Sequence, residues 1–294
     1  MNKIIILFLC VIGFTQSITN HGFSTAKGVA LSGSFIAKTD NHSAIFYNPA
    51  GLSYNSNLII NSSYARIFNQ EYLPYLNLAL TTKNTKIGAF GISLSQLQID
   101  YLSRMLSRER VFSLSHGFFL QNDQNSSLSI GYTMNMNEWS MGNSAGTNGD
   151  GSNGIESLDD IYVYGVDVGI QASLRKKHFL GAFLKNINLP KVGGSNSLMT
   201  LAREIALGAA YSPMENLTTS FTMTNKLGEN NSSVKAGLEY IINKHFIWYV
   251  GLQSNPNLIS TGFSINIKNI FIQHGFKSHP ILPATHIFEI GYKF

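Results

Sequence analysis

The stretch Ile161–Leu174, IYVYGVDVGIQASL, alternates between two kinds of side chain. One set of alternate positions is apolar and comprises Tyr162, Tyr164, Val166, Val168, Ile170, Ala172 and Leu174. The other set is mostly small or polar and comprises Val163, Gly165, Asp167, Gly169, Gln171 and Ser173. Because successive side chains of a β-strand point to opposite faces, the stretch predicts a strand with one apolar face and one polar face.

The polar face indicates the environment of such strands. The same alternation recurs along the chain, as in Leu128–Asn137 and Val234–Tyr240, and its polar positions hold mainly Gly, Ser, Thr and Asn. A soluble sheet usually covers that face with Lys and Glu. We therefore expect an all-β fold, a transmembrane antiparallel barrel whose apolar faces point into lipid and whose polar faces line the lumen.

Composition supports this class and argues against others. The chain has 294 residues, of which 13% are charged, against about 25% in soluble domains. No apolar run after residue 20 approaches the roughly 18 residues of a membrane helix, so any membrane span must consist of strands. The net charge of +5 comes without a basic stripe with interleaved aromatic residues, so nucleic acid is not an expected partner.

Residues 1–20 read as a secretory signal peptide. Lys3 supplies the positive start, Ile4–Phe14 is an apolar segment of suitable length, and the small residues that follow offer a cleavage site. The only cysteine, Cys10, lies within this segment. The mature chain would therefore lack disulfides and thiolate metal sites.

Residues 21–57 do not alternate, which separates them from the rest of the chain. Asp40 is positioned to cap a short helix that runs toward Tyr47, and Pro49 with Gly51 would end that helix. The segment is too short for a domain and too apolar for a free tail. We expect it to lie inside or just under the barrel as a hatch, and residues 58–294 to form the barrel.

The alternating segments can be marked off as strands. They are Leu58–Phe68, Tyr72–Thr82, Lys86–Gln98, Arg110–Leu120, Leu128–Asn137, Ile161–Leu174, His178–Ile187, Glu204–Tyr211, Leu217–Thr224, Val234–Ile241, Phe246–Gln253, Leu258–Ile267, Ile270–Lys277 and Thr285–Phe294. This makes about fourteen, an even number within the ~8 to 26 of single-chain outer-membrane barrels.

The connections between these strands test the prediction independently. In such barrels short periplasmic turns alternate with longer external loops. Short connections such as Arg175–Lys177 and Lys268–Asn269 do alternate with a longer set, which comprises Ile99–Glu109, Glu138–Asp160, Asn188–Arg203 and Asn225–Ser233. We therefore expect an outer-membrane protein of a Gram-negative bacterium with both termini in the periplasm.

The last strand carries an expected assembly signal. Phe288, Ile290, Tyr292 and Phe294 fall on one face, and the chain ends on the aromatic residue. This ending resembles the signal that the barrel assembly machinery recognises. That machinery and outer-membrane lipid are therefore expected partners.

Several short motifs resemble one family. Asn48, Pro49, Ala50 and Gly51 match the Asn-Pro-Ala element of the hatch in the superfamily of FadL-like transporters, particularly its PorV/PorQ-like members. Lys27–Gly33, Asp40–Ala44, Leu207–Tyr211 and Ala236–Tyr240 are similar to runs of the same family. The resemblance implies a fourteen-stranded barrel with an N-terminal hatch.

Two functions follow from this resemblance. The first is passive handling of hydrophobic small molecules, with Asn48, Pro49, Ala50 and Gly51 acting as a mobile hatch on the ligand path or, alternatively, only as a helix stop. The second is an accessory role in a type IX-like protein secretion or surface-anchoring complex, whose subunits would then be partners.

Other residue patterns carry weaker signals. Asn148–Asp159 half matches a calcium loop but ends in Asp where that loop has a bidentate Glu, so a Gly- and Asn-rich loop is the simpler interpretation. Arg104, Arg108 and Arg110 could meet lipopolysaccharide phosphates or form a solvated loop base. No motif for zinc or for a serine nucleophile occurs. We expect no metal, no cofactor and no enzymatic activity.

Overall fold

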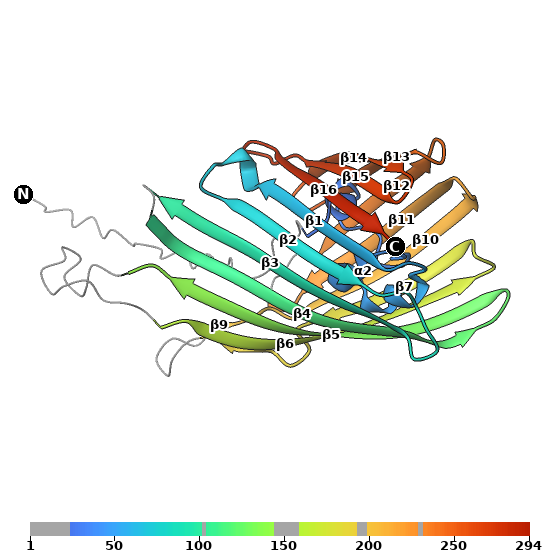
Figure 1. The fold of residues 1–294 in the computed structure, drawn as a ribbon, viewed down its shortest axis with the longest axis horizontal. Helices are drawn as coiled ribbons and strands as arrows, with labels where there is room; N and C mark the ends of the chain where they lie inside the picture. The colour runs from blue at the N-terminus through green and yellow to red at the C-terminus, as the bar shows by residue number, and fades with distance from the viewer. Residues whose placement is uncertain (1–23, 102–103, 144–158, 193–198, 229–231) are drawn as a thin grey trace, which may run out of the picture.

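The protein is a closed antiparallel β-barrel of fourteen strands (Figure 1). The computed structural model describes residues 24–101, 104–143, 159–192, 199–228 and 232–294. The expected signal peptide, residues 1–20, lies outside the described residues. Each barrel strand pairs with its neighbours in the sequence, and β16 closes the barrel by pairing with β1, from Ile59 with Lys293 to Arg66 with His286.

All fourteen predicted strands are present. They are β1 (Ile59–Arg66), β2 (Pro74–Thr81), β3 (Ala89–Tyr101), β4 (Arg104–Asn122), β5 (Ser126–Met141), β6 (Ile161–Leu174), β7 (His178–Lys185), β10 (Glu204–Met214), β11 (Leu217–Lys226), β12 (Ser233–Ile241), β13 (Phe246–Gln253), β14 (Leu258–Ile267), β15 (Ile270–Lys277) and β16 (Thr285–Lys293). A separate two-stranded sheet pairs β8 (Lys191–Val192) with β9 (Met199–Thr200).

The predicted long loop Ile99–Glu109 is wrong, because β3 and β4 continue through it. Gln98 pairs with Arg108 and Ile99 with Ser107, and a bulge follows before Asp100 pairs with Met105. Polar residues occupy this extension, and Gln98 Nε2 donates to Asp100 Oδ1 at 2.9 Å. The charged and polar residues of 99–109 belong to a ladder that continues beyond the apolar part of the strands.

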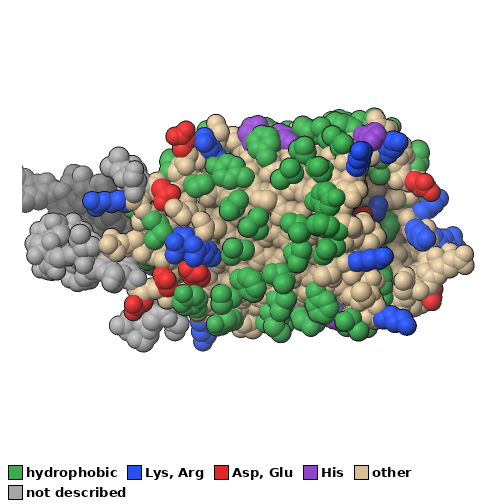
Figure 2. Space-filling view, in the orientation of Figure 1, with side chains coloured by type: hydrophobic (Ala, Val, Ile, Leu, Met, Phe, Trp, Pro, Cys, Tyr) green, Lys and Arg blue, Asp and Glu red, His purple; other side chains and the backbone are tan. Residues whose placement is uncertain are grey.

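The two faces of the strands point as the alternation predicts. On β6 the outward residues Tyr162 and Tyr164 are 52% and 65% exposed, whereas the inward residues Asp167 and Gln171 are buried. Figure 2 shows hydrophobic side chains over the middle of the barrel and charged side chains gathered toward its two ends. A surface that is apolar outside and polar inside suits a barrel surrounded by lipid.

The two ends of the barrel differ in their connections. At one, the turn end, strands are joined through 123–125, 175–177, 215–216 and 268–269, and Phe294 N donates to Leu58 O at 2.8 Å. At the other, the loop end, β5 and β6 are joined through 142–160 and β7 and β10 through 186–203. Within the described residues, no helix has the length and apolarity needed to cross a membrane.

The segment 24–57 lies inside the barrel (Figure 1), and we call it the hatch. It contains α1 (Ala26–Ala30), α2 (Ala44–Tyr47) and the 3₁₀ helix η1 (Pro49–Tyr54). The other 3₁₀ helix, η2 (Ile67–Asn69), follows β1.

Two details of the expected hatch helix are wrong. Ser43 and not Asp40 precedes α2, because the Asp40 carboxylate turns to Lys27. Pro49 begins η1 and does not merely end α2. The fixed φ of proline and its missing N–H suit the first turn of a helix.

Candidate functional site

A ring of wall glycines fits the hatch closely. Inward-facing glycines occur at one level on ten strands, and we call them the glycine ring: Gly91, Gly117, Gly131, Gly169, Gly181, Gly208, Gly237, Gly251, Gly262 and Gly275. A Cβ atom at any of them would touch a hatch residue; at Gly131 it would lie 2.5 Å from Ala50 N, and at Gly275 2.5 Å from Ala26 O. The barrel wall therefore lacks side chains where the hatch backbone approaches it.

Polar contacts then fix the hatch to the wall. Lys27, on α1, is 4% exposed, and its Nζ lies 2.9 Å from Glu239 Oε2 on β12 and 3.5 Å from Asp40 Oδ1. Burial alone would lower the pKa of Lys27, but Asp40 and Glu239 outweigh burial and raise that pKa above its usual value. Lys27 is therefore charged and joins two hatch elements to the barrel.

Glu289 forms a second attachment, at the first residue of α1. This buried carboxylate of β16 accepts from Ala26 N at 2.7 Å and from Asn61 Nδ2 at 3.1 Å, and it meets His42 Nε2 of the hatch. Breaking it would leave a charge and a backbone donor without partners away from water, which is costly.

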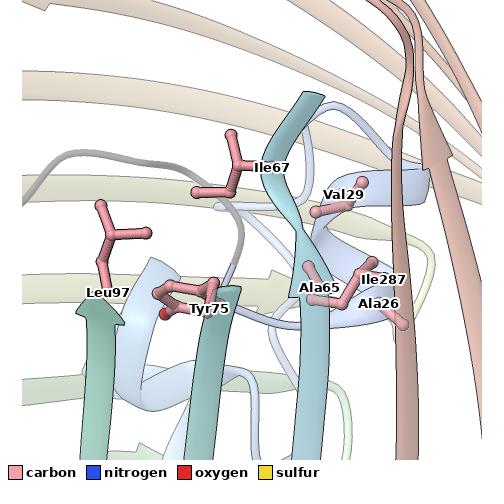
Figure 3. Packing of buried hydrophobic residues seen from close by; sticks show 7 residues of the cluster. All are labelled: Ala26, Val29, Ala65, Ile67, Tyr75, Leu97 and Ile287. Atoms are coloured by element: carbon pink, nitrogen blue, oxygen red, sulfur yellow. The ribbon is translucent and has the colours of Figure 1, made fainter. Parts of the chain in front are cut away.

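Apolar packing joins the same region (Figure 3). Ala26 and Val29 of α1 pack on Ala65 of β1 and Ile287 of β16, and the cluster extends toward the loop end through Ile67, Tyr75 and Leu97. This cluster is one of several in which apolar residues of the hatch pack against apolar residues of the barrel wall.

The predicted hatch residues meet at the wall. Asn48 is fully buried, and its Nδ2 donates to Ile36 O at 2.9 Å and to Ile170 O of β6 at 3.0 Å, while its Oδ1 accepts from Ala50 N at 3.2 Å. Pro49 and Ala50 rest on the glycine ring, and a side chain at Gly51 would collide with Thr39. Their role on a ligand path remains a prediction.

Between the hatch and the loop end lies a cavity of about 150 Å³. The hatch supplies its floor, which consists of Ser24, Gly33, Ile36, Ile45, Phe46 and Tyr47. Apolar wall residues border this floor, and they are Tyr75, Leu97, Val111, Phe183 and Ala206.

The remaining lining is polar. The charged members are Glu109, Asp167, Lys185, Glu204 and Lys235, and the uncharged polar members are Ser95, Ser113, Asn135, Asn137, Asn186 and Thr224. Sequence reasoning placed such residues in the lumen but did not single them out. The only feature of the sequence that could have marked them is a large polar residue at an inward position, where other strands have Gly or Ser.

The wall beside the cavity is interrupted at β7. Only Val168–Leu174 of β6 pair with β7, and β6 continues to Ile161 without it. Asn188 replaces the missing strand, since its Oδ1 accepts from Val166 N at 3.0 Å and its Nδ2 donates to Tyr164 O at 2.8 Å. Among the described residues, this side chain and one backbone bond, from Ile187 N to Val166 O, take the place of a paired strand along this part of β6.

Other predicted sites are placed as follows. Phe288, Ile290, Tyr292 and Phe294 all face outward on or beside β16 and are 40% to 62% exposed. The arginines expected on an outer loop lie on β4, where Arg108 and Arg110 each approach Glu138 to 3.6 Å.

No group of three or more potential metal ligands occurs among the described residues. The half-matched calcium loop lies outside them except for Asp159.

Comparisons with known proteins identify the fold. No family model matches the sequence, and no curated protein matches it. The structure is similar to the toluene transporter TodX of Pseudomonas putida, with a TM-score of 0.64 and 13% identity over 95% of this chain and 99% of that one.

Two further structures are similar. They are the toluene transporter TbuX of Ralstonia pickettii, with a TM-score of 0.61 and 12% identity over 93% of this chain and 98% of that one, and a Pseudomonas aeruginosa FadL homologue, with a TM-score of 0.56 and 10% identity over 92% and 98%. At these identities the likeness establishes a fold shared with FadL-type barrels.

Proposed function

We propose that the protein is an outer-membrane channel that handles small, largely apolar molecules passively and is not an enzyme. One observation carries the proposal: a membrane barrel encloses a molecule-sized cavity whose floor and part of whose wall are apolar. Pockets for small ligands are typically apolar with a few placed polar groups. The transport of toluene by TodX and TbuX, as their names state, supports the same reading.

The route through the barrel follows from the tight fit of the hatch. A solute enters from the loop end and reaches the cavity, below which the glycine ring and the Lys27 and Glu289 attachments hold the hatch. Straight passage would require all of these contacts to break. The interruption of the wall between β6 and β10 lies directly at the cavity, because Asp167, Lys185 and Asn186 belong to both. We therefore propose that the solute leaves sideways into the membrane at this point.

A reversible crosslink tests both the channel and its exit. The double variant Val166→Cys with Ile187→Cys would form a disulfide between β6 and position 187. In the unmodified chain, the N–H of Ile187 donates to Val166 O. Uptake of radiolabelled toluene by cells that produce this variant should fall under oxidising conditions and recover with a reductant. Equal uptake in both states would overturn the sideways exit, and uptake no greater than that of cells lacking the protein would overturn the channel.

The orientation is part of the proposal. We place the loop end outside the cell and both termini in the periplasm, with the apolar belt in outer-membrane lipid and Arg104, Arg108 and Arg110 near lipopolysaccharide phosphates. Phe288, Ile290, Tyr292 and Phe294 would present the assembly signal to the barrel assembly machinery. A protease site inserted into the connection 278–284 should be cut in whole cells, whereas one inserted into 242–245 should not.

PorV/PorQ-like membership and a secretion role form the second candidate. An accessory subunit of a type IX-like or surface-anchoring complex would present its loop-end connections to protein partners. Purification in mild detergent decides between the two candidates. Stable association with a large translocon would favour the accessory role, whereas a small molecule in the lumen without protein partners favours the channel.

A further inference from the structure

The cavity lining is divided into an apolar side and a polar side. The hatch presents Ile36, Ile45 and Phe46, while charged and amide side chains project from the wall. An entirely apolar cavity of roughly 150 Å³ can stay dry and hold benzene, whereas polar groups in a cavity require partners. The lining therefore suits a molecule that itself has an apolar part and a polar part.

On one side of the wall the polar groups already satisfy one another. Asp167 accepts from Asn135 Nδ2 at 2.7 Å and from Asn186 N at 2.8 Å. Ser113 donates to Asn135 Oδ1 at 2.7 Å. This chain of bonds across β4, β5 and β6 shapes the cavity and has little capacity left for a ligand.

On the other side a hydroxyl group is left over. Thr224 is 6% exposed and faces inward on β11, and its Oγ1 has no hydrogen-bond partner among the described residues. Lys235, on the neighbouring strand β12, faces Thr222 in the register and so lies one inward position from Thr224. Both residues line the cavity. A buried polar atom without a partner is costly, so Thr224 points to an occupant that bonds it.

The charges around the cavity restrict that occupant. Glu109, Asp167 and Glu204 bring three carboxyl groups to the lining, against the two lysines Lys185 and Lys235. A carboxylate ligand would add a further negative charge to this set, whereas a neutral oxygen can accept from Lys235 without repulsion.

We propose that the cavity binds single-ring molecules with a neutral oxygen-bearing head group, the ring on the hatch floor and the oxygen at Thr224 Oγ1 and Lys235 Nζ. The volume of the cavity suits a single ring, since about 150 Å³ accommodates a benzene-sized body. This inference rests on the proposed function, because it assumes that solutes enter the cavity. It gives the protein a substrate class distinct from the hydrocarbon named for TodX and TbuX.

Two probes of nearly equal shape test the inference. Binding of 4-fluorophenol and 4-fluorotoluene to the full chain in detergent would be followed by ¹⁹F NMR, with empty micelles as the blank. We expect 4-fluorophenol to bind at least about 5-fold more tightly, as the gain of one or two hydrogen bonds implies. Tighter binding of 4-fluorotoluene, or of 4-fluorobenzoate over 4-fluorophenol, would overturn the proposal.

Matched variants locate the head group. Thr224→Val should weaken 4-fluorophenol about 3- to 10-fold and Lys235→Met about 10-fold, while 4-fluorotoluene binding stays within about 2-fold. Thr219→Val makes the same change on the outer face of β11 and should alter the binding of neither probe. Equal effects of Thr224→Val and Thr219→Val would overturn the assignment of the head-group site. If neither probe binds the unmodified chain, the proposed channel function fails with it.

Discussion

The inner surface of the barrel has two levels that share one alternation but differ in side-chain size. At the level of the hatch, β4, β5 and β6 turn Gly117, Gly131 and Gly169 inward, and these glycines are neighbours in the register. At the level of the cavity the same strands turn Val111, Asn137 and Asp167 inward. On these three strands an inward residue has no side chain where the hatch backbone lies against it and has one where the cavity lies.

This difference indicates that the hatch is an integral part of the barrel interior. Protein interiors are close-packed, so backbone can approach a wall only where that wall has no side chains. The two levels should therefore respond differently to the same kind of substitution. Variants that add or remove groups at the hatch level should be costly, and those at the cavity level should be tolerated.

The largest effect is expected at the buried lysine of the hatch. Lys27→Met would leave Glu239 and Asp40 without their partner. Because removing one member of a buried ion pair strands the other, the free energy of unfolding, measured by urea titration in detergent, should fall by about 3 to 5 kcal/mol. The double variant Lys27→Met with Glu239→Gln should recover part of this loss. A loss below about 1 kcal/mol would mean that the pair does not hold the hatch.

A smaller loss of stability is expected at Asn48, which joins α2 to η1 in the hatch. Asn48→Ala removes bonds to Ile36 O, Ile170 O and Ala50 N, which should lower the free energy of unfolding by about 3 kcal/mol. Limited proteolysis should also cut the hatch faster, because the bond to Ile170 joins it to β6. Asn57→Ala is the control, since among the described residues the Asn57 side chain bonds only its exposed neighbour Ser56, and it should change stability by less than about 0.5 kcal/mol. Similar losses in both variants would show that Asn48 does not fasten the hatch.

A single added carbon at the glycine ring should lower the free energy of unfolding. In Gly117→Ala the new Cβ would lie against Pro49 O and 3.0 Å from Leu52 Cβ. Overpacking against backbone forces the hatch to move, so we expect a loss of about 2 kcal/mol by urea titration. Ala182→Leu, which enlarges a side chain on the lipid face of β7, should cost less than about 0.5 kcal/mol. A neutral Gly117→Ala would mean that the hatch fits more loosely than the structure shows.

Alternation sufficed for the barrel but not for its contents. The period of two in Ile161–Leu174 fixes which residues face lipid, because a slip of one position would turn every apolar side chain inward. The ends of strands were less predictable, since Ile99 and Arg108 were predicted as loop residues although they belong to a ladder.

The hatch contacts depend on pairs far apart in the chain, and these leave no local pattern. Lys27 with Glu239 and Ala26 with Glu289 are examples. The glycines at polar positions were visible, yet only their common level in the register shows that they face one object. The predicted helix cap at Asp40 was wrong for the same reason, because the Asp40 carboxylate pairs with Lys27, thirteen residues earlier in the chain, and not with the start of α2.

The smallest effect is expected from the counterpart of Gly117→Ala on the same strand. Val111→Leu also adds one carbon to an inward residue of β4, but there the side chain borders the cavity. Without close-packed neighbours the added methylene has room, so the free energy of unfolding should change by less than about 0.5 kcal/mol. Binding of the single-ring probes should weaken measurably, because the methylene takes up cavity volume. The two sites on β4 differ in what faces them across the lumen, which is the hatch at Gly117 and the cavity at Val111. A loss from Val111→Leu as large as that from Gly117→Ala would mean that the lumen is packed at both levels.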